Sequence, residues 1–115
     1  MIVDDNSDMR RMLRSIITDE SKELNEYLDA TDGNEAVEQY SHFHPDVVLM
    51  DIQMKNMNGF AAAEKIYEQA PDAKVVFVTS FDTEVFRKKA EQLHSHGFVT
   101  KDKLSKLGLL LQSFK

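Results

Sequence analysis

Three carboxylates stand directly after short apolar runs, at the points where strands of a parallel sheet would end. Asp4 and Asp5 follow residues 1–3, and Asp51 follows residues 47–50. Ligands of a parallel α/β sheet bind outside the carboxyl ends of its strands, so we expect these three side chains to converge. Carboxylates held close together repel one another, and a bound divalent cation or a captured proton relieves the repulsion. The sequence therefore predicts a Mg²⁺ site.

Two more polar residues stand at predicted strand ends and complete a reactive set. Thr79 closes the apolar run 75–78, and Lys101 follows the run 97–100. A carboxylate can attack phosphorus as a nucleophile and form an aspartyl phosphate. Mg²⁺ would neutralise the incoming charge, while the lysine ammonium and the threonine hydroxyl would hold the phosphoryl oxygens. These residue types favour phosphoryl transfer to an aspartate.

The elements that must position these side chains alternate along the chain. Short apolar runs alternate with segments of helical periodicity, which is typical of βαβ units and a parallel sheet. Strands are predicted over residues 1–3, 27–31, 46–50, 74–79 and 97–100, with five helices between and after them. The sequence therefore predicts an α/β domain.

Capping residues and prolines indicate where the helices begin and end. The predicted N-caps are Asn6 or Ser7 for the first helix, Asp32 in a capping-box variant with Glu35 for the second, and Asn58 for the third. Pro45 and Pro71 are predicted to end the second and third units. The fourth helix is predicted to span about residues 82–93.

Apolar stripes predict which helix faces pack on the sheet. The first helix has Met9, Met12, Leu13, Ile16 and Ile17, the fourth has Val85, Phe86, Ala90 and Leu93, and the fifth has Leu104, Leu107, Leu111 and Phe114. Leu109 and Leu110 fall outside the last stripe. We expect both at the surface, as part of an interface or, more simply, as scattered leucines.

Length, charge and composition limit the class of protein. The chain has 115 residues, no cysteine and a formal net charge of -6. That length fits one domain with a normal core, and the lack of cysteine excludes disulfides and thiolate chemistry. The acidic balance disfavours binding of nucleic acid or of an anionic membrane by this segment, and no apolar run reaches the roughly 18 residues of a membrane span. With no leader peptide visible, we expect one cytoplasmic domain over residues 1–115.

In order along the chain, these motifs resemble the receiver domain of two-component response regulators. The motifs are Val3-Asp4-Asp5, residues 46–54, Asn58-Gly59, residues 78–80 and residues 97–101. Each is a weak signal alone, but five in this order at successive strand ends are specific and span nearly the whole chain. The resemblance implies a flavodoxin-like fold, a single doubly wound five-stranded parallel sheet of order 2-1-3-4-5 with helices on both faces, as in chemotaxis receivers.

The resemblance also implies a role for each residue of the set. Asp51 would accept the phosphoryl group, Asp4, Asp5, Asp51 and the backbone carbonyl of Gln53 would hold Mg²⁺, and Thr79 and Lys101 would hold the phosphoryl oxygens. The donor would be a phosphohistidine on a sensor histidine kinase or a histidine phosphotransfer protein. Such a domain catalyses only its own phosphorylation and dephosphorylation, and is not an enzyme that acts on other substrates.

A switch is implied in the same way. Thr79 and Phe98 would change rotamer together and alter the surface of the fourth helix, fifth strand and fifth helix, through which a homodimer could form. Phe98 has no hydroxyl, so it cannot form the tyrosine hydrogen bond that many family members use. Gln53 and Phe81 would flank the approach of the water that releases phosphate.

Two residues depart from the family pattern, and the second of them bears on output. Lys55 and Asp102 stand where many receivers have proline. An acidic residue after the site lysine resembles receivers attached to helix-turn-helix DNA-binding domains, so we expect control of transcription through a domain outside this chain. The alternative is a stand-alone receiver that acts in a phosphorelay or by protein contact.

Three other classes fit the residues less well. A haloacid-dehalogenase-like phosphatase also uses a strand-end aspartyl nucleophile, but it has a second aspartate two residues later, where this chain has Gln53. A flavodoxin-like flavin binder needs a phosphate loop rich in hydroxyls and amides, whereas residues 4–8 are acidic. A receiver-like interaction module without phosphorylation would normally have lost a site residue, and this chain retains them all.

Overall fold

The computed structural model describes residues 1–20 and 28–114, so the predicted strand residue Tyr27 lies outside the described part. The strands are β1 Ile2–Val3, β2 Asp29–Ala30, β3 Val48–Met50, β4 Val75–Thr79 and β5 Gly97–Thr100. The helices are α1 Ser7–Glu20, α2 Gly33–Phe43, α3 Gly59–Gln69, α4 Glu84–Gln92 and α5 Ser105–Gln112, with a 3₁₀ turn, η1, at Lys101–Lys103. The described elements thus alternate as predicted.

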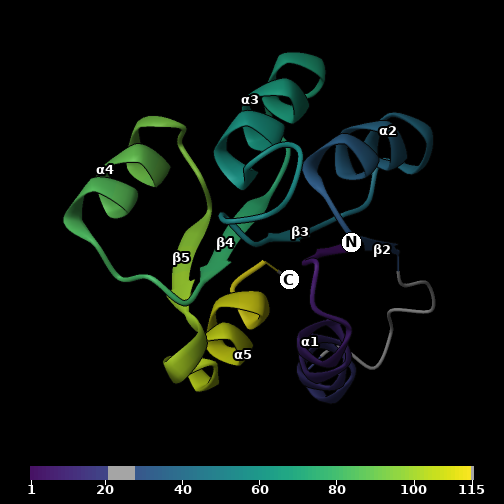
Figure 1. The fold of residues 1–115 in the computed structure, drawn as a ribbon. Helices are drawn as coiled ribbons and strands as arrows, with labels where there is room; N and C mark the ends of the chain where they lie inside the picture. Colours follow the sequence, from purple (N-terminus) through teal and green to yellow (C-terminus); the bar gives the residue numbers. More distant parts are fainter. Residues whose placement is uncertain (21–27, 115) are drawn as a thin grey trace.

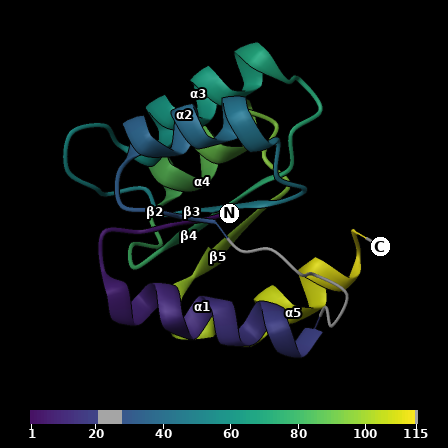
Figure 2. The same cartoon turned by 90° about the vertical axis from the view of Figure 1, so that its right-hand side faces the viewer.

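The five strands form one parallel sheet in the order β2-β1-β3-β4-β5, which confirms the predicted fold. Val3 in the interior strand β1 lies opposite Ala30 of β2 and Met50 of β3. Helices α1 and α5 cover one face of the sheet, and α2, α3 and α4 cover the other (Figures 1 and 2). Every strand is followed by a helix, so the loops that leave the strands gather at one edge of the sheet.

Two apolar layers hold this arrangement together. On the α2, α3 and α4 side, Phe60 and Ile66 pack with Phe77 of β4. On the α1 and α5 side, Leu13 and Leu107 pack against the opposite face. Burial of each such side chain contributes about 1.5–3 kcal/mol, and all five residues of β4 are buried because helices cover both faces.

Capping at the first two helices follows the prediction in part. The side chain of Asn6 accepts a hydrogen bond from the Met9 amide at 2.9 Å, so Asn6 is the cap of α1. The Asp32 carboxylate accepts from the Glu35 amide at 2.8 Å. The predicted return bond of the capping box is wrong, because the Glu35 carboxylate instead accepts from the Thr31 hydroxyl at 2.9 Å. Thr31 precedes the cap, and its amide also lies 3.4 Å from the same carboxylate oxygen.

Helix α4 begins at Glu84, two residues later than predicted. The hydroxyl of Thr83 accepts from the Phe86 amide at 3.1 Å and caps the helix. Asp82 lies before the cap and its carboxylate accepts a hydrogen bond from Arg87. Asp82 therefore belongs to the loop between β4 and α4.

Both prolines follow helix ends as predicted. Helix α2 ends at Phe43, and His44 takes a left-handed conformation with φ 45° before Pro45. Helix α3 ends at Gln69, and Ala70 is extended before Pro71, as expected for a residue that precedes proline. Among the described residues, no helix is long and apolar enough to cross a membrane.

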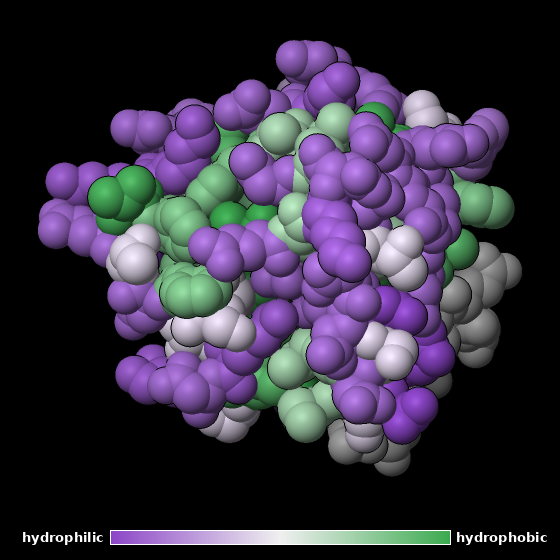
Figure 3. Space-filling view, viewed as in Figure 1, coloured by the Kyte–Doolittle hydropathy of each residue, from purple (hydrophilic) through white to green (hydrophobic). Residues whose placement is uncertain are grey.

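The predictions from the apolar stripes are wrong at three positions, Met12, Val85 and Leu110. Met12 lies at the edge of its stripe and is exposed, and Val85 of α4 is 73% exposed. Leu110 was expected at the surface, but it packs into the cluster beneath α5 and leaves only its neighbour Leu109 in solvent. The surface in Figure 3 is mostly hydrophilic, with a small hydrophobic area over α4 at the left.

Two leucines of α5 give a matched test of this packing. Leu107 is fully buried and Leu109 is 71% exposed. We expect Leu107→Ala to lower the free energy of unfolding by about 2–5 kcal/mol, because it leaves a cavity. Leu109→Ala should change it by less than about 0.5 kcal/mol. Urea unfolding of both variants is the measurement, and equal losses would contradict the described orientation of α5.

Candidate functional site

The carboxyl edge of the sheet brings together four of the predicted residues, Asp4, Asp5, Asp51 and Lys101, because all five strands run in the same direction. The Asp51 amide donates to the Val3 carbonyl oxygen at 2.9 Å, which aligns the ends of β1 and β3. Thr79 ends β4 opposite Thr100 of β5. The predicted convergence of strand ends is therefore present in the fold.

An acidic cluster forms at the ends of β1 and β3. Asp4 is 1% exposed and Asp51 is 6% exposed, whereas Asp5 is exposed to solvent. One carboxylate oxygen from each of the three lies within 4.8 Å of the others. Oxygen ligands at this spacing suit a hard divalent cation such as Mg²⁺. The chemistry of the donor set fits the predicted metal.

Each buried carboxylate is also held by a backbone amide. The Asn6 amide donates to Asp4 Oδ1 at 2.9 Å, and the Ile52 amide donates to Asp51 Oδ1 at 2.9 Å. These bonds orient both carboxylates and leave their Oδ2 atoms for other partners. The partner within reach is an ammonium.

Lys101 contacts both buried carboxylates. Its Nζ lies 2.9 Å from Asp4 Oδ2 and 3.5 Å from Asp51 Oδ2. Burial lowers the pKa of Lys101, but the bond with Asp4 and the charge of Asp51 outweigh burial and raise it. The lysine remains an ammonium in this arrangement and acts as the counter-ion of the cluster.

The pKa of Asp51 is raised from 3.8 to about 6. Burial is the largest cause, and the negative charge of Asp4 is the next. The Lys101 ammonium and the Ile52 amide lower the pKa but do not cancel these effects. The ionised form of Asp51 is therefore disfavoured when no further cation is bound.

Gly59 lets α3 approach the backbone of Asp51. The Gly59 amide donates to the Ile52 carbonyl oxygen at 2.7 Å. A Cβ atom at Gly59 would lie 2.1 Å from the Asp51 carbonyl oxygen, closer than any side chain tolerates. The sequence identified Asn58-Gly59 as a helix start, and the structure adds that the glycine is needed for this close contact.

The remaining predicted residues lie on β4 and β5 and in the loops that follow β3 and β4. Thr79 is buried, and its hydroxyl accepts from the Phe81 amide at 3.2 Å. Phe81 is 48% exposed and Gln53 is exposed. Phe98 is partly buried on β5, and the Arg87 guanidinium lies 4.8 Å from the centre of its ring.

Sequence reasoning missed one residue next to the acids. Arg10 Nη1 donates to the backbone carbonyl oxygen of Asp4 at 2.7 Å. Arg10 lies four residues after the cap Asn6, which is one helical turn, so its side chain reaches back toward the strand end. That spacing is the signal from which the contact could have been predicted.

Comparison with known families supports the resemblance that the sequence motifs indicate. Residues 1–112 match the model of the response regulator receiver domain. The chain belongs to the response regulator receiver domain family. This receiver domain is 38% identical over 101 residues to the chemotaxis protein CheY of Thermotoga maritima, a match that covers 88% of this chain and 82% of that protein.

Two further receiver relatives extend the comparison. The chain is 31% identical to the transcriptional regulatory protein DegU of Brevibacillus brevis, over 89% of this chain and 43% of DegU. A solved chain of the CheX-CheY-BeF3-Mg complex from Borrelia burgdorferi is 30% identical, with a TM-score of 0.88 over 97% of this chain and 84% of that one. Receiver relatives thus occur both as short chemotaxis proteins and as parts of longer regulators.

The raised pKa of Asp51 predicts a pH-dependent stability. Folding favours the protonated form, so this contribution to the free energy of unfolding is complete below about pH 4 and is lost as the pH rises through about 6. Asp51→Asn removes the charge that faces Asp4, Asp5 and Lys101. In a chelating buffer we expect the variant to match wild type near pH 4 and to exceed it by about 2–3 kcal/mol near pH 8.

Urea unfolding at a series of pH values measures this difference. The gap between variant and wild type should widen between pH 4 and about pH 6 and then level off toward pH 8. A constant gap over that range would contradict a raised pKa for Asp51.

Proposed function

We propose that this receiver domain is a Mg²⁺-dependent phosphoacceptor in which Asp51 takes a phosphoryl group from a phosphohistidine. The donor would be a sensor histidine kinase or a histidine phosphotransfer protein, since receiver domains interact with both. The observation that carries the proposal is the position of Asp51, buried beside Asp4 and 3.5 Å from the Lys101 ammonium.

The metal would be held by Asp4, Asp5, Asp51 and the backbone carbonyl of Gln53. Support for three of these ligands comes from the 4.8 Å spacing of their carboxylate oxygens. When bound, Mg²⁺ supplies positive charge that neutralises the incoming phosphoryl group. It would also lower the cost of ionising Asp51, whose pKa is otherwise raised.

The residues of the chain would divide the reaction between them. Asp51 Oδ1 accepts a hydrogen bond from the Ile52 amide, so Oδ2 is the oxygen that attacks phosphorus. The bond between phosphorus and the donor imidazole breaks as the new phosphorus–oxygen bond forms, and the imidazole keeps the electron pair. The Lys101 ammonium would move from Asp51 to a phosphoryl oxygen. The Thr79 hydroxyl accepts from the Phe81 amide and can donate its proton to another phosphoryl oxygen.

We propose that Thr79 and Phe98 carry the signal to the surface of α4, β5 and α5, which could also mediate a homodimer. Thr79 and Phe98 lie on adjacent strands. The Arg87 guanidinium over the Phe98 ring would have to yield when the ring moves inward. The ring has no hydroxyl, so packing alone would hold its inward position.

Output is proposed to be transcriptional, through a domain outside this chain. Asp102 after the site lysine supports this, as does the similarity to DegU. A stand-alone receiver is the second candidate, because the match to the Thermotoga maritima chemotaxis protein covers 82% of that protein. The cytoplasmic location, the single domain over residues 1–115, and the lack of nucleic-acid binding or catalysis on other substrates stay predictions.

An aspartyl-nucleophile phosphatase remains disfavoured. Such an enzyme needs an acid/base carboxylate two residues after the nucleophile, and that position holds Gln53. An amide cannot take or give the proton at this step.

Phosphorylation by acetyl phosphate tests the proposed function. With Mg²⁺ present, intact-mass measurement should detect one added phosphoryl group in wild type, and peptide mapping should locate it on Asp51. Asp51→Asn should abolish the adduct, and Asp5→Ala should slow its formation at least about tenfold. Asp8→Ala, an exposed acid of α1, is the control and should react as wild type does. An adduct that persists in Asp51→Asn would refute the assignment.

The lifetime of the phosphorylated state should depend on Phe81. Its ring is half-exposed at the start of the loop after β4 and offers no hydrogen bond that could orient a water for attack. We expect phosphate release to be faster in Phe81→Glu, and faster to a smaller extent in Phe81→Ala, because water gains access. Release measured after removal of acetyl phosphate decides this, and unchanged or slower rates in both variants would show that Phe81 does not gate the water.

A further inference from the structure

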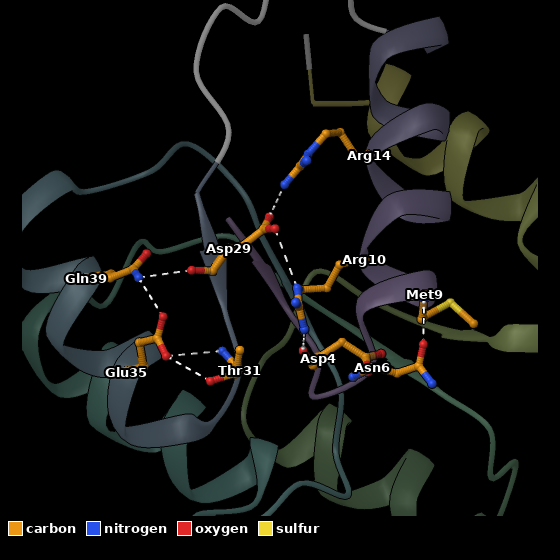
Figure 4. Close-up of polar contacts among 9 residues, drawn as sticks. All are labelled: Asp4, Asn6, Met9, Arg10, Arg14, Asp29, Thr31, Glu35 and Gln39. Carbon is orange, nitrogen blue, oxygen red and sulfur yellow. Dashed lines mark hydrogen bonds and ion pairs between the residues drawn. The ribbon is translucent and has the colours of Figure 1, made fainter.

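The side chain of Arg10 lies between the end of β1 and the edge strand β2 (Figure 4). Its Nη1 donates to the Asp4 carbonyl oxygen at 2.7 Å, and its Nε lies 3.5 Å from Asp29 Oδ2. The side chain is only 16% exposed. A cation thus contacts the backbone of Asp4, whereas Lys101 contacts its carboxylate.

The Asp4 carbonyl needs such a donor. Strand β1 ends at Val3, and the chain then turns away from the sheet toward α1, so the Asp4 carbonyl lies beyond the strand ladder. Asp4 is 1% exposed, and a buried carbonyl without a donor costs about 1–3 kcal/mol. Arg10 supplies a charge-assisted hydrogen bond, which is stronger than a neutral one.

We propose that Arg10 is a positioning residue for the metal site, a role that rests on the proposed binding of Mg²⁺. Its bond to the Asp4 carbonyl fixes the peptide plane between Asp4 and Asp5. The Asp4 carboxylate is held separately by the Asn6 amide and by Lys101. The exposed carboxylate of Asp5 depends on that peptide for its direction, so loss of Arg10 acts mainly through Asp5.

Asp29 holds the Arg10 side chain in place. Its carboxylate pairs with Arg10 and also with Arg14, 2.5 Å from Nη2, and its backbone carbonyl accepts from the Gln39 side chain at 2.9 Å. The anion that holds Arg10 is therefore itself fixed from α1 and α2. Arg14 pairs with the same anion, so Arg14→Met removes a partner of Asp29 and leaves the Arg10 bond to Asp4 in place, which makes it a matched control.

Mg²⁺ titration by calorimetry, without phosphodonor, tests the proposal in wild type, Arg10→Met, Arg10→Lys and Arg14→Met. We expect Mg²⁺ binding to be about tenfold weaker in Arg10→Met, partly restored in Arg10→Lys, and within twofold of wild type in Arg14→Met. Urea unfolding of the same proteins separates this from loss of stability, because both methionine variants lose a partner of Asp29.

A double-mutant cycle tests the route through Asp5. If Arg10 acts by orienting Asp5, Arg10→Met should change Mg²⁺ affinity less than twofold in the Asp5→Ala background. A full tenfold effect in that background, unchanged affinity in Arg10→Met, or an equal loss in Arg14→Met would each overturn the positioning role. Absence of Mg²⁺ binding by wild type would refute the proposed function itself, and with it this role. The wild-type titration alone distinguishes that outcome from a failure of the positioning role.

Discussion

Repulsion among carboxylates at the carboxyl edge of the sheet is the constraint on which the rest of the structure depends. Asp4 and Asp51 are buried next to each other, where each added negative charge is costly. Lys101 contacts both, but one ammonium cannot balance three carboxylates. The edge therefore keeps a net negative charge and favours any event that brings positive charge to it. Parallel strands maintain this crowding, because their packed faces prevent the acids from moving apart.

The structure fixes the acids firmly and leaves their surroundings free to adapt. The backbone at Asp51 is held by β1 on one side and by the close contact of Gly59 on the other. By contrast, Phe81 is half-exposed, and Ala90 is the one residue of α4 that is fully buried among those the structure describes. A chemical change at Asp51 is thus most easily accommodated by movement of the loop after β4 and of α4.

The strand ends and their polar residues could be predicted because each depends on a short local pattern. A buried strand of a doubly wound sheet is a continuous apolar run, and the residue after it must lie at the edge. Fold order and the roles of Asp51 and Lys101 came from resemblance, since spacing alone does not decide which strands are neighbours. The caps Asn6 and Asp32 were predicted because a single side chain decides each, whereas the return bond from Glu35 failed because Thr31 competes for its carboxylate. Arg10 was missed because its partner is a backbone carbonyl, which every residue type has, so only the spacing from Asn6 indicates the contact.

Gly97 has a consequence for how α5 and β5 can move. A Cβ atom at this position would lie 2.3 Å from Leu110 Cδ2, so the leucine rests directly above the main chain of β5. Gly97 contributes no side chain whose rotamer could absorb a displacement. A shift of the β5 main chain at Gly97 therefore meets the Leu110 side chain directly, which couples that piece of β5 to α5. Helix α4 has one fully buried residue, Ala90, and otherwise packs through the partly buried Phe86 and Leu93, which makes the seam between α4 and β5 the natural shear plane of the domain.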